Sequence, residues 1–109
     1  MEGLEQVAFE IISTVGTARS CYIEAIQKAK EGKMDEIEDL FKAGDEAFNE
    51  GHKAHMGLLT KEAEGNSEGV NLLLLHAEDQ LMSAEAFKTI ATEFIDVYTR
   101  LTKLEEKLK

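Results

Sequence analysis

The sequence predicts an all-α domain, built as an antiparallel three-helix bundle. Three observations predict it: proline and tryptophan are absent, helix-favouring Ala, Leu, Glu and Lys dominate, and no strand-like alternation of apolar and polar residues occurs. Such side chains lose little freedom in a helix, and no residue removes a backbone donor. The 109 residues suffice for one modest core, so we treat residues 1–109 as a single domain.

The first helix is expected over residues 4–31, because apolar residues follow an unbroken 4-3 spacing there. Lys28 and Lys30 complement the helix dipole in its last turns, and Gly32 supplies the left-handed residue that ends it. The expected core positions of this helix are Leu4, Ala8, Ile11, Val15, Ala18, Tyr22, Ala25 and Ala29.

The second helix is expected over residues 34–64, with Asp35 and Glu36 in its first turn. Its inward stripe contains Gly44 and Gly51, which lower helix propensity by about 1 kcal/mol each. We interpret them as sites where two helices approach closely. The full stripe is Met34, Ile37, Phe41, Gly44, Phe48, Gly51, His55 and Leu58. The Gly- and Asn-rich run at 65–69 ends this helix.

The third helix is expected over residues 70–104, and its apolar arc is wider than one pair of neighbouring helices would bury. A first side, expected to be internal, holds Leu74, Ala77, Leu81, Ala84, Ala91, Ile95 and Tyr98. A second side, left exposed in a monomer, holds Leu72, His76, Asp79, Ser83, Ala86, Ile90 and Val97. This second side indicates self-association. Glu78 and Glu85 belong to a solvated band, and the charged tail 103–109 is expected to fray.

Charge and cysteine content exclude several classes of function. The formal net charge is −10, with 22 acidic against 12 basic residues, which argues against nucleic-acid binding. An acidic surface favours basic protein partners. No segment is apolar and long enough for direct membrane insertion, and no secretory pattern occurs. The single Cys21 excludes an intrachain disulfide, suits a cytoplasmic protein, and is expected to be a packed rather than a catalytic residue.

The candidate site lies in the run His76-Ala77-Glu78-Asp79-Gln80-Leu81-Met82. Positions i, i+3 and i+4 are neighbours on a helix, so an imidazole, a carboxylate and an amide share one face. A histidine in such apolar surroundings is either satisfied structurally or used chemically. His52 and His55 could also form a metal pair with Glu50 or Glu62, but two histidines at this spacing are a common accident. His55, on the inward stripe, is expected to be an interhelical hydrogen-bond partner.

Collinear matches over about residues 8–101 identify a resemblance. They are Phe9-Glu10-Ile11-Ile12, Gly16 with Ala18-Arg19-Ser20, Glu24-Ala25, Gly32, His52, Glu62-Ala63-Glu64-Gly65, the run from His76 to Met82, and Tyr98. The chain resembles the enzyme IIA component of the lactose/cellobiose class of the bacterial phosphoenolpyruvate-dependent sugar phosphotransferase system. The run from His76 to Met82 is more acidic than in many members of this family. Those members hold glutamine at the position of Glu78, a second histidine at that of Gln80, and glutamine around His55.

The resemblance implies a phosphocarrier. His76 would accept a phosphoryl group from phosphorylated HPr, as a tele-phosphohistidine, and pass it to a cysteine of the cognate IIB. IIB then phosphorylates a disaccharide of the cellobiose, chitobiose or lactose type that the membrane component IIC carries. The resemblance also implies a homotrimer with one divalent ion, expected to be Mg²⁺, held by Asp79 of each subunit. Gln80 could donate a hydrogen bond to a phosphoryl oxygen.

The chemistry of the imidazole and carboxylate side chains is compatible with these roles. A neutral imidazole, with an unperturbed pKa of about 6.5, can attack phosphorus near neutral pH, and its phosphorylated form is labile enough for a relay. Three carboxylates brought together by symmetry would repel one another or require a hard cation with oxygen ligands. Two alternatives stay open: a non-catalytic oligomeric helical adaptor, and a metal-storage bundle. The latter usually needs Glu-x-x-His motifs, which this sequence lacks.

Overall fold

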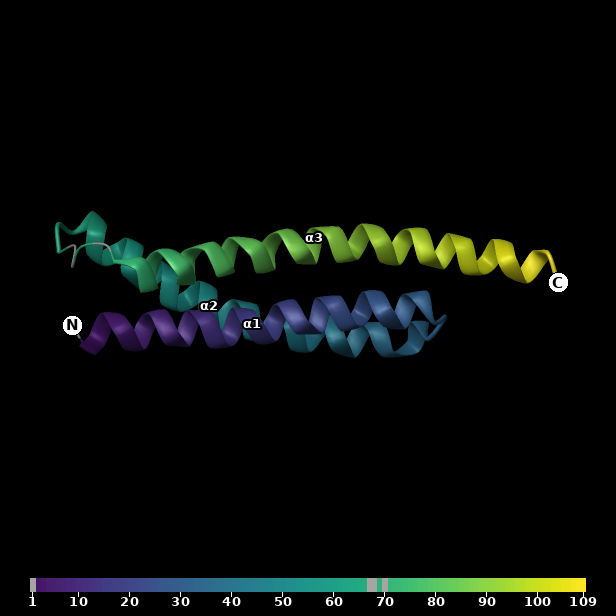
Figure 1. Ribbon diagram of the computed structural model, residues 1–109, viewed down its shortest axis with the longest axis horizontal. Coiled ribbons are helices and arrows are strands. Elements are labelled where there is room, and N and C mark those ends of the chain that lie inside the picture. The colour runs from purple at the N-terminus through teal and green to yellow at the C-terminus, as the bar shows by residue number, and fades with distance from the viewer. Residues whose placement is uncertain (1, 67–68, 70) are drawn as a thin grey trace.

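The computed structural model consists of three long helices, and Figure 1 shows them arranged in an elongated bundle. The structure describes residues 2–66, 69 and 71–109. Helix α1 spans Glu2–Lys30, a short 3-10 turn η1 spans Met34–Glu36, α2 spans Ile37–Ala63 and α3 spans Leu72–Lys107. Among the described residues there is no strand, so the predicted all-α class is confirmed. Helices α1 and α3 run in the same direction and α2 runs against both (Figure 1).

The helix ends depart from the predicted bounds in a few places. Residues 34–36 form a 3-10 turn rather than the first turn of α2. Asn71 caps α3, because its side chain accepts a hydrogen bond from the Leu74 backbone N–H at 2.8 Å, so α3 begins at Leu72. The expected start at residue 70 lies outside the described residues, as do residues 67 and 68 of the predicted turn.

At its other end α3 continues to Lys107, beyond the predicted end at 104. The expected fraying of the charged tail is wrong over this stretch, because Leu, Glu and Lys are good helix formers and no breaker interrupts them. The predicted helix-ending role of Gly32 is confirmed, because this residue has φ +80° after α1.

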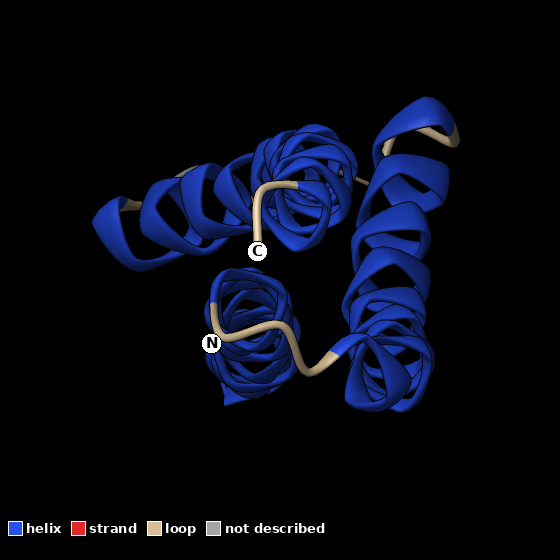
Figure 2. Ribbon diagram, turned by 90° about the vertical axis from the view of Figure 1, so that its right-hand side faces the viewer, coloured by secondary structure: helices blue, strands red, loops and turns tan. Residues whose placement is uncertain are grey.

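Helix α1 lies at the centre of the packing and contacts both other helices, which touch each other much less. All eight core positions predicted for α1 are buried. The buried positions of α3 are Ala77, Leu81, Ala84 and Ala91, each on the side predicted to be internal. Viewed along the molecule, the helices are inclined to one another rather than strictly parallel (Figure 2). Three of the four buried residues of α3 are alanines, and these small side chains let α3 pack closely on α1.

The two glycines of α2 fulfil the predicted role of close approach. Gly44 and Gly51 are the buried residues of α2. A Cβ atom at Gly44 would lie 2.8 Å from a ring carbon of Tyr22, and one at Gly51 would lie 2.6 Å from Thr14 Oγ1. No side chain larger than hydrogen fits at either position without a shift, so α2 can seat against α1 only with glycine there.

One polar junction crosses the bundle. Tyr22 of α1 donates a 2.6 Å hydrogen bond to Asp45 Oδ1 of α2, and Lys88 Nζ of α3 lies 3.0 Å from the same oxygen. The apolar core around α1 is thus accompanied by one carboxylate of α2 that contacts both other helices.

Over the described residues, no helix has both the length and the apolar content that crossing a bilayer requires.

Candidate functional site

His76 lies in the second turn of α3 and is exposed to solvent. Its ring borders a shallow, mostly apolar hollow that it shares with Leu72 and Leu73. Leu73 is partly buried against the core, whereas Leu72 is 82% exposed. The Asn71 cap fixes where the helix begins and thereby sets the direction in which His76 projects. The imidazole is therefore a reachable group on a rigid element, with apolar side chains beside it.

Asp79 is also exposed, and it lies on a face of α3 that none of the described residues covers. We call this face the outer face of α3; its members share one side of the helix at spacings of three and four. They are Leu72, Leu75, Asp79, Met82, Ile90, Phe94, Val97, Leu101 and Leu104. The apolar members are between 43% and 82% exposed. The side predicted to be uncovered is confirmed except at Ser83, which is half-buried. His76 lies at the edge of this face.

Gln80 is half-buried and follows His76 by one turn on the same side of α3. The predicted trio of His76, Asp79 and Gln80 is therefore placed together by helical spacing. Among the described residues, no group of three or more His, Cys, Asp or Glu side chains could hold a metal ion within one chain. Asp79 alone would thus be a monodentate or bidentate ligand needing partners from outside the chain.

The two histidines of α2 do not assemble a metal site. His52 is exposed and stacks on Phe48, with ring centroids 6.0 Å apart, and its ring centroid lies 6.0 Å from that of His55. His55 instead contacts α3: its Nδ1 atom lies 2.6 Å from Glu78 Oε2. This buried Nδ1 makes no well-aligned hydrogen bond among the described residues, so the contact has ion-pair geometry. The expected interhelical contact of His55 is present, but the hydrogen bond that was expected with it is not formed.

Glu78 departs from its predicted place in a solvated band. Its side chain is 29% exposed and turns toward α2 to meet His55. A helical wheel of α3 alone placed Glu78 outside, because it carries no information on how α2 is inclined. The signal that could have found this pair is the inward position of His55, which required a polar partner from another helix.

Cys21 is half-buried on α1, beside Gly44. Burial, and next the charge of Glu24, raise the pKa of the Cys21 thiol. A thiol with a raised pKa is a poor nucleophile near neutral pH, which agrees with the expected packed role.

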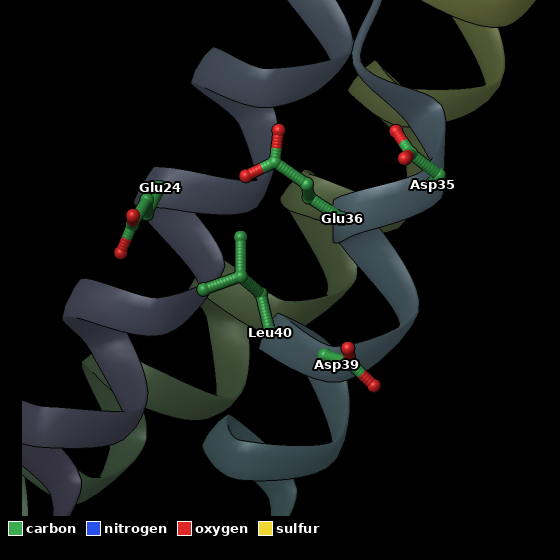
Figure 3. Close-up of a pocket in the computed structure, with 5 residues that line it drawn as sticks. All are labelled: Glu24, Asp35, Glu36, Asp39 and Leu40. Atoms are coloured by element: carbon green, nitrogen blue, oxygen red, sulfur yellow. The ribbon is translucent and has the colours of Figure 1, made fainter.

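Four carboxylates gather at the opposite end of the bundle, near the turn between α1 and α2. Glu24, Asp35, Glu36 and Asp39 line a hollow together with Leu40 (Figure 3). Their carboxylates point in different directions in Figure 3, and Glu36 lies 3.5 Å from Lys28. This cluster is therefore a solvated acidic end and does not converge on a ligand. The candidate site remains on α3 around His76.

The chain is similar to known proteins over most of its length. A family model described as "PTS system, Lactose/Cellobiose specific IIA subunit" matches residues 6–99. The oligo-beta-mannoside-specific EIIA component of Bacillus subtilis is 37% identical over 86% of this chain and 86% of its own. The cellobiose-specific EIIA component of Lactococcus lactis is 39% identical over 93% and 87%.

A solved structure is also similar. The crystal structure of the cellobiose-specific enzyme IIA from Bacillus anthracis superposes with a TM-score of 0.91 at 42% identity, covering 94% of each chain. Together with the family match, this similarity shows both the fold and the family. The chain belongs to the lactose/cellobiose-specific IIA family of the sugar phosphotransferase system, whose members are phosphotransferase components of sugar uptake.

Proposed function

We propose that His76 accepts the phosphoryl group from phosphorylated HPr and passes it to the cysteine of the cognate IIB during uptake of a disaccharide. The carrying observation is the exposure of His76 on a rigid helix, at the edge of an apolar hollow. A visiting protein can reach this ring without any rearrangement of the bundle. The sugar would be of the cellobiose, chitobiose or lactose type, carried by IIC.

The phosphoryl group moves in two transfer steps. The imidazole lone pair of His76 forms a P–N bond as the bond between phosphorus and the HPr donor atom breaks, and the donor leaves with that electron pair. The P–N bond to His76 then breaks as the thiolate of IIB forms a P–S bond, which returns the lone pair to His76. No water takes part, so the protein's contribution is position and charge.

Charge at this site favours a basic visitor. The chain carries a net charge of −10, and Glu78 and Asp79 lie within one turn of His76. A phosphoryl group near the Asp79 carboxylate on an acidic chain needs positive charge from elsewhere, and a basic partner supplies it while steering the encounter. Gln80, half-buried one turn further along, is the residue of this chain that would donate an amide hydrogen bond to a phosphoryl oxygen.

Self-association as a homotrimer is part of the proposal. The outer face of α3 is a long apolar strip that one chain leaves uncovered, and an exposed strip of this kind is typical of an interface. Asp79 is a carboxylate within that strip. Three copies would place like charges together, and a divalent ion such as Mg²⁺ would offset their repulsion. The described residues of one chain hold no such site, so the residue fits the ion only in the assembly.

Phosphate incorporation tests the proposal. We expect the chain to gain an acid-labile, base-stable phosphate when incubated with phosphoenolpyruvate, enzyme I and HPr. His76→Gln should abolish labelling while helicity and assembly mass stay unchanged, whereas His52→Gln, which alters another exposed histidine, should label normally. Labelling of His76→Gln would refute the acceptor assignment, and an unlabelled wild-type chain would favour a non-catalytic adaptor.

A further inference from the structure

We propose that His55 and Glu78 act as a positioning pair that fixes the rotational setting of α3 at the level of His76. This inference rests on the proposed function, because it concerns how the acceptor imidazole is aimed. His55 Nδ1 on α2 lies 2.6 Å from Glu78 Oε2 on α3, and Glu78 follows the acceptor by two residues.

The pair lies where α3 has few other contacts with α2. Helices α2 and α3 touch much less than either touches α1, and the described polar contacts between them are His55 with Glu78 and Asp45 with Lys88. The second contact lies nearly three turns further along α3, so it cannot orient the turn that carries His76. Near the acceptor, His55–Glu78 is the polar contact that links α2 and α3 among the described residues.

The neighbouring residue explains why a second anchor matters. Ala77 is fully buried in the core cluster with Ala8 and Ile11 of α1. Consecutive helical residues differ by about 100° in direction, so Ala77 faces α1 while Glu78 faces α2. Alanine packs closely, but its methyl group is short. The contact of Glu78 with His55 adds a restraint from α2, and the two anchors together position the turn that carries His76.

Both partners are partly buried, so the contact is partly shielded from solvent. The side chains of His55 and Glu78 are 21% and 29% exposed, and the Nδ1 atom itself is buried. Exposed pairs contribute little, whereas a partly desolvated pair holds its geometry. Phosphoryl transfer depends on in-line alignment, and a misplacement of about 1 Å can cost on the order of a hundredfold in rate. Loss of the pair should therefore slow the transfer step itself.

The test is a double-mutant cycle on the full chain, using single-turnover phosphorylation by phosphorylated HPr. We expect His55→Ala and Glu78→Ala each to lower the maximal rate about tenfold or more, at an unchanged half-saturating HPr concentration. The double variant should be no slower than either single variant, because one contact is lost in each case. His55→Gln combined with Glu78→Gln should restore the rate, since two amides of similar length can bond without charge.

Two controls separate positioning from general stability. Asp96→Ala breaks the exposed Asp96–Arg100 pair on the same helix, 3.2 Å long, and should leave the rate unchanged. Tyr22→Phe removes an interhelical hydrogen bond far from His76 and should lower stability without slowing the transfer. Should an alanine variant fail to fold, Glu78→Gln alone keeps the test, with the same expected slowing.

The possible outcomes distinguish the positioning role from the acceptor role. The positioning role would be overturned by wild-type rates in the folded single variants, by additive losses of rate in the double variant, or by a change only in the half-saturating HPr concentration. Each of these results would leave the acceptor assignment intact. A wild-type chain that takes up no phosphate would remove the proposed function and this inference together.

Discussion

Tyr22 and Asp45 are joined by a 2.6 Å hydrogen bond, which places a polar contact beside the apolar core. Tyr22 is fully buried, whereas among the described residues no charged residue is buried as a whole. Lys88 of α3 lies 3.0 Å from the same Asp45 oxygen. One carboxylate therefore receives a donor from each of the other two helices. Because all three helices meet there, the junction fixes their relative register.

Tyr22→Phe should destabilise the bundle. The change removes a hydrogen bond to a charged acceptor and leaves Asp45 with only Lys88, which should cost about 1.5–3 kcal/mol of unfolding free energy. Urea denaturation monitored by circular dichroism measures the change. Tyr98→Phe is the matched control, because Tyr98 is half-buried and its hydroxyl makes no hydrogen bond among the described residues. Equal stability of the two variants would show that the junction contributes nothing.

The same tyrosine predicts how stability changes at high pH. Burial first, and then the hydrogen bond and charge of Asp45, raise the pKa of Tyr22 far above its ordinary value of 10.0. Below pH 10 the folded and unfolded chains both keep the proton, so its stabilisation is complete. Above pH 10 the unfolded chain loses the proton and the folded chain does not, so stability falls by up to about 1.4 kcal/mol per pH unit.

Thermal unfolding between pH 8 and pH 11.5 checks this expectation. Wild type should lose stability more steeply above pH 10 than Tyr22→Phe, which lacks the titrating hydroxyl. Comparing the two slopes removes the contributions that lysines and Cys21 make to both proteins. Parallel slopes would contradict the raised pKa of Tyr22.

Gly51→Ala should weaken the contact between α1 and α2. Its Cβ would lie 2.6 Å from Thr14 Oγ1 and 2.7 Å from Val15 Cγ1, so the two helices must move apart. Overpacking of this kind costs about 1–3 kcal/mol. Gly57→Ala, on the same helix with nothing within 4 Å of its Cβ, should instead stabilise by about 0.5–1 kcal/mol through helix propensity. Urea midpoints of the pair measure both effects, and a stabilised Gly51→Ala would rule out the close approach.

Periodicity predicted much of the fold because α1 packs on one continuous stripe, and every predicted core position of α1 is buried. The same spacing predicted the uncovered face that carries Asp79 and the roles of Gly44 and Gly51. It misplaced Glu78, because a contact between α2 and α3 depends on how the helices are inclined, which single-helix patterns do not encode. The 3-10 turn at Met34–Glu36 was missed for a related reason: 3-10 and α-helical turns share nearly the same residue preferences.

Asp79→Leu should keep or strengthen the proposed trimer without any metal ion. Asp79 is exposed in the middle of an apolar strip, with Leu75 and Met82 on either side along the helix. Leucine would continue that strip and remove a charge that three copies would otherwise bring together, and replacing a buried charge by apolar packing is often stabilising. Multi-angle light scattering with and without a chelator measures the mass.

The control for this prediction lies on the same helix. Asp96→Leu replaces a carboxylate that pairs with Arg100 and points away from the outer face of α3, so it should not alter the chelator dependence of the mass. Wild type should lose mass on chelation and Asp79→Leu should not. If Asp79→Leu were monomeric at concentrations where wild type is trimeric, apolar contact along α3 would be insufficient by itself. The ion would then be an essential bridge between subunits rather than a means of tolerating repelling carboxylates.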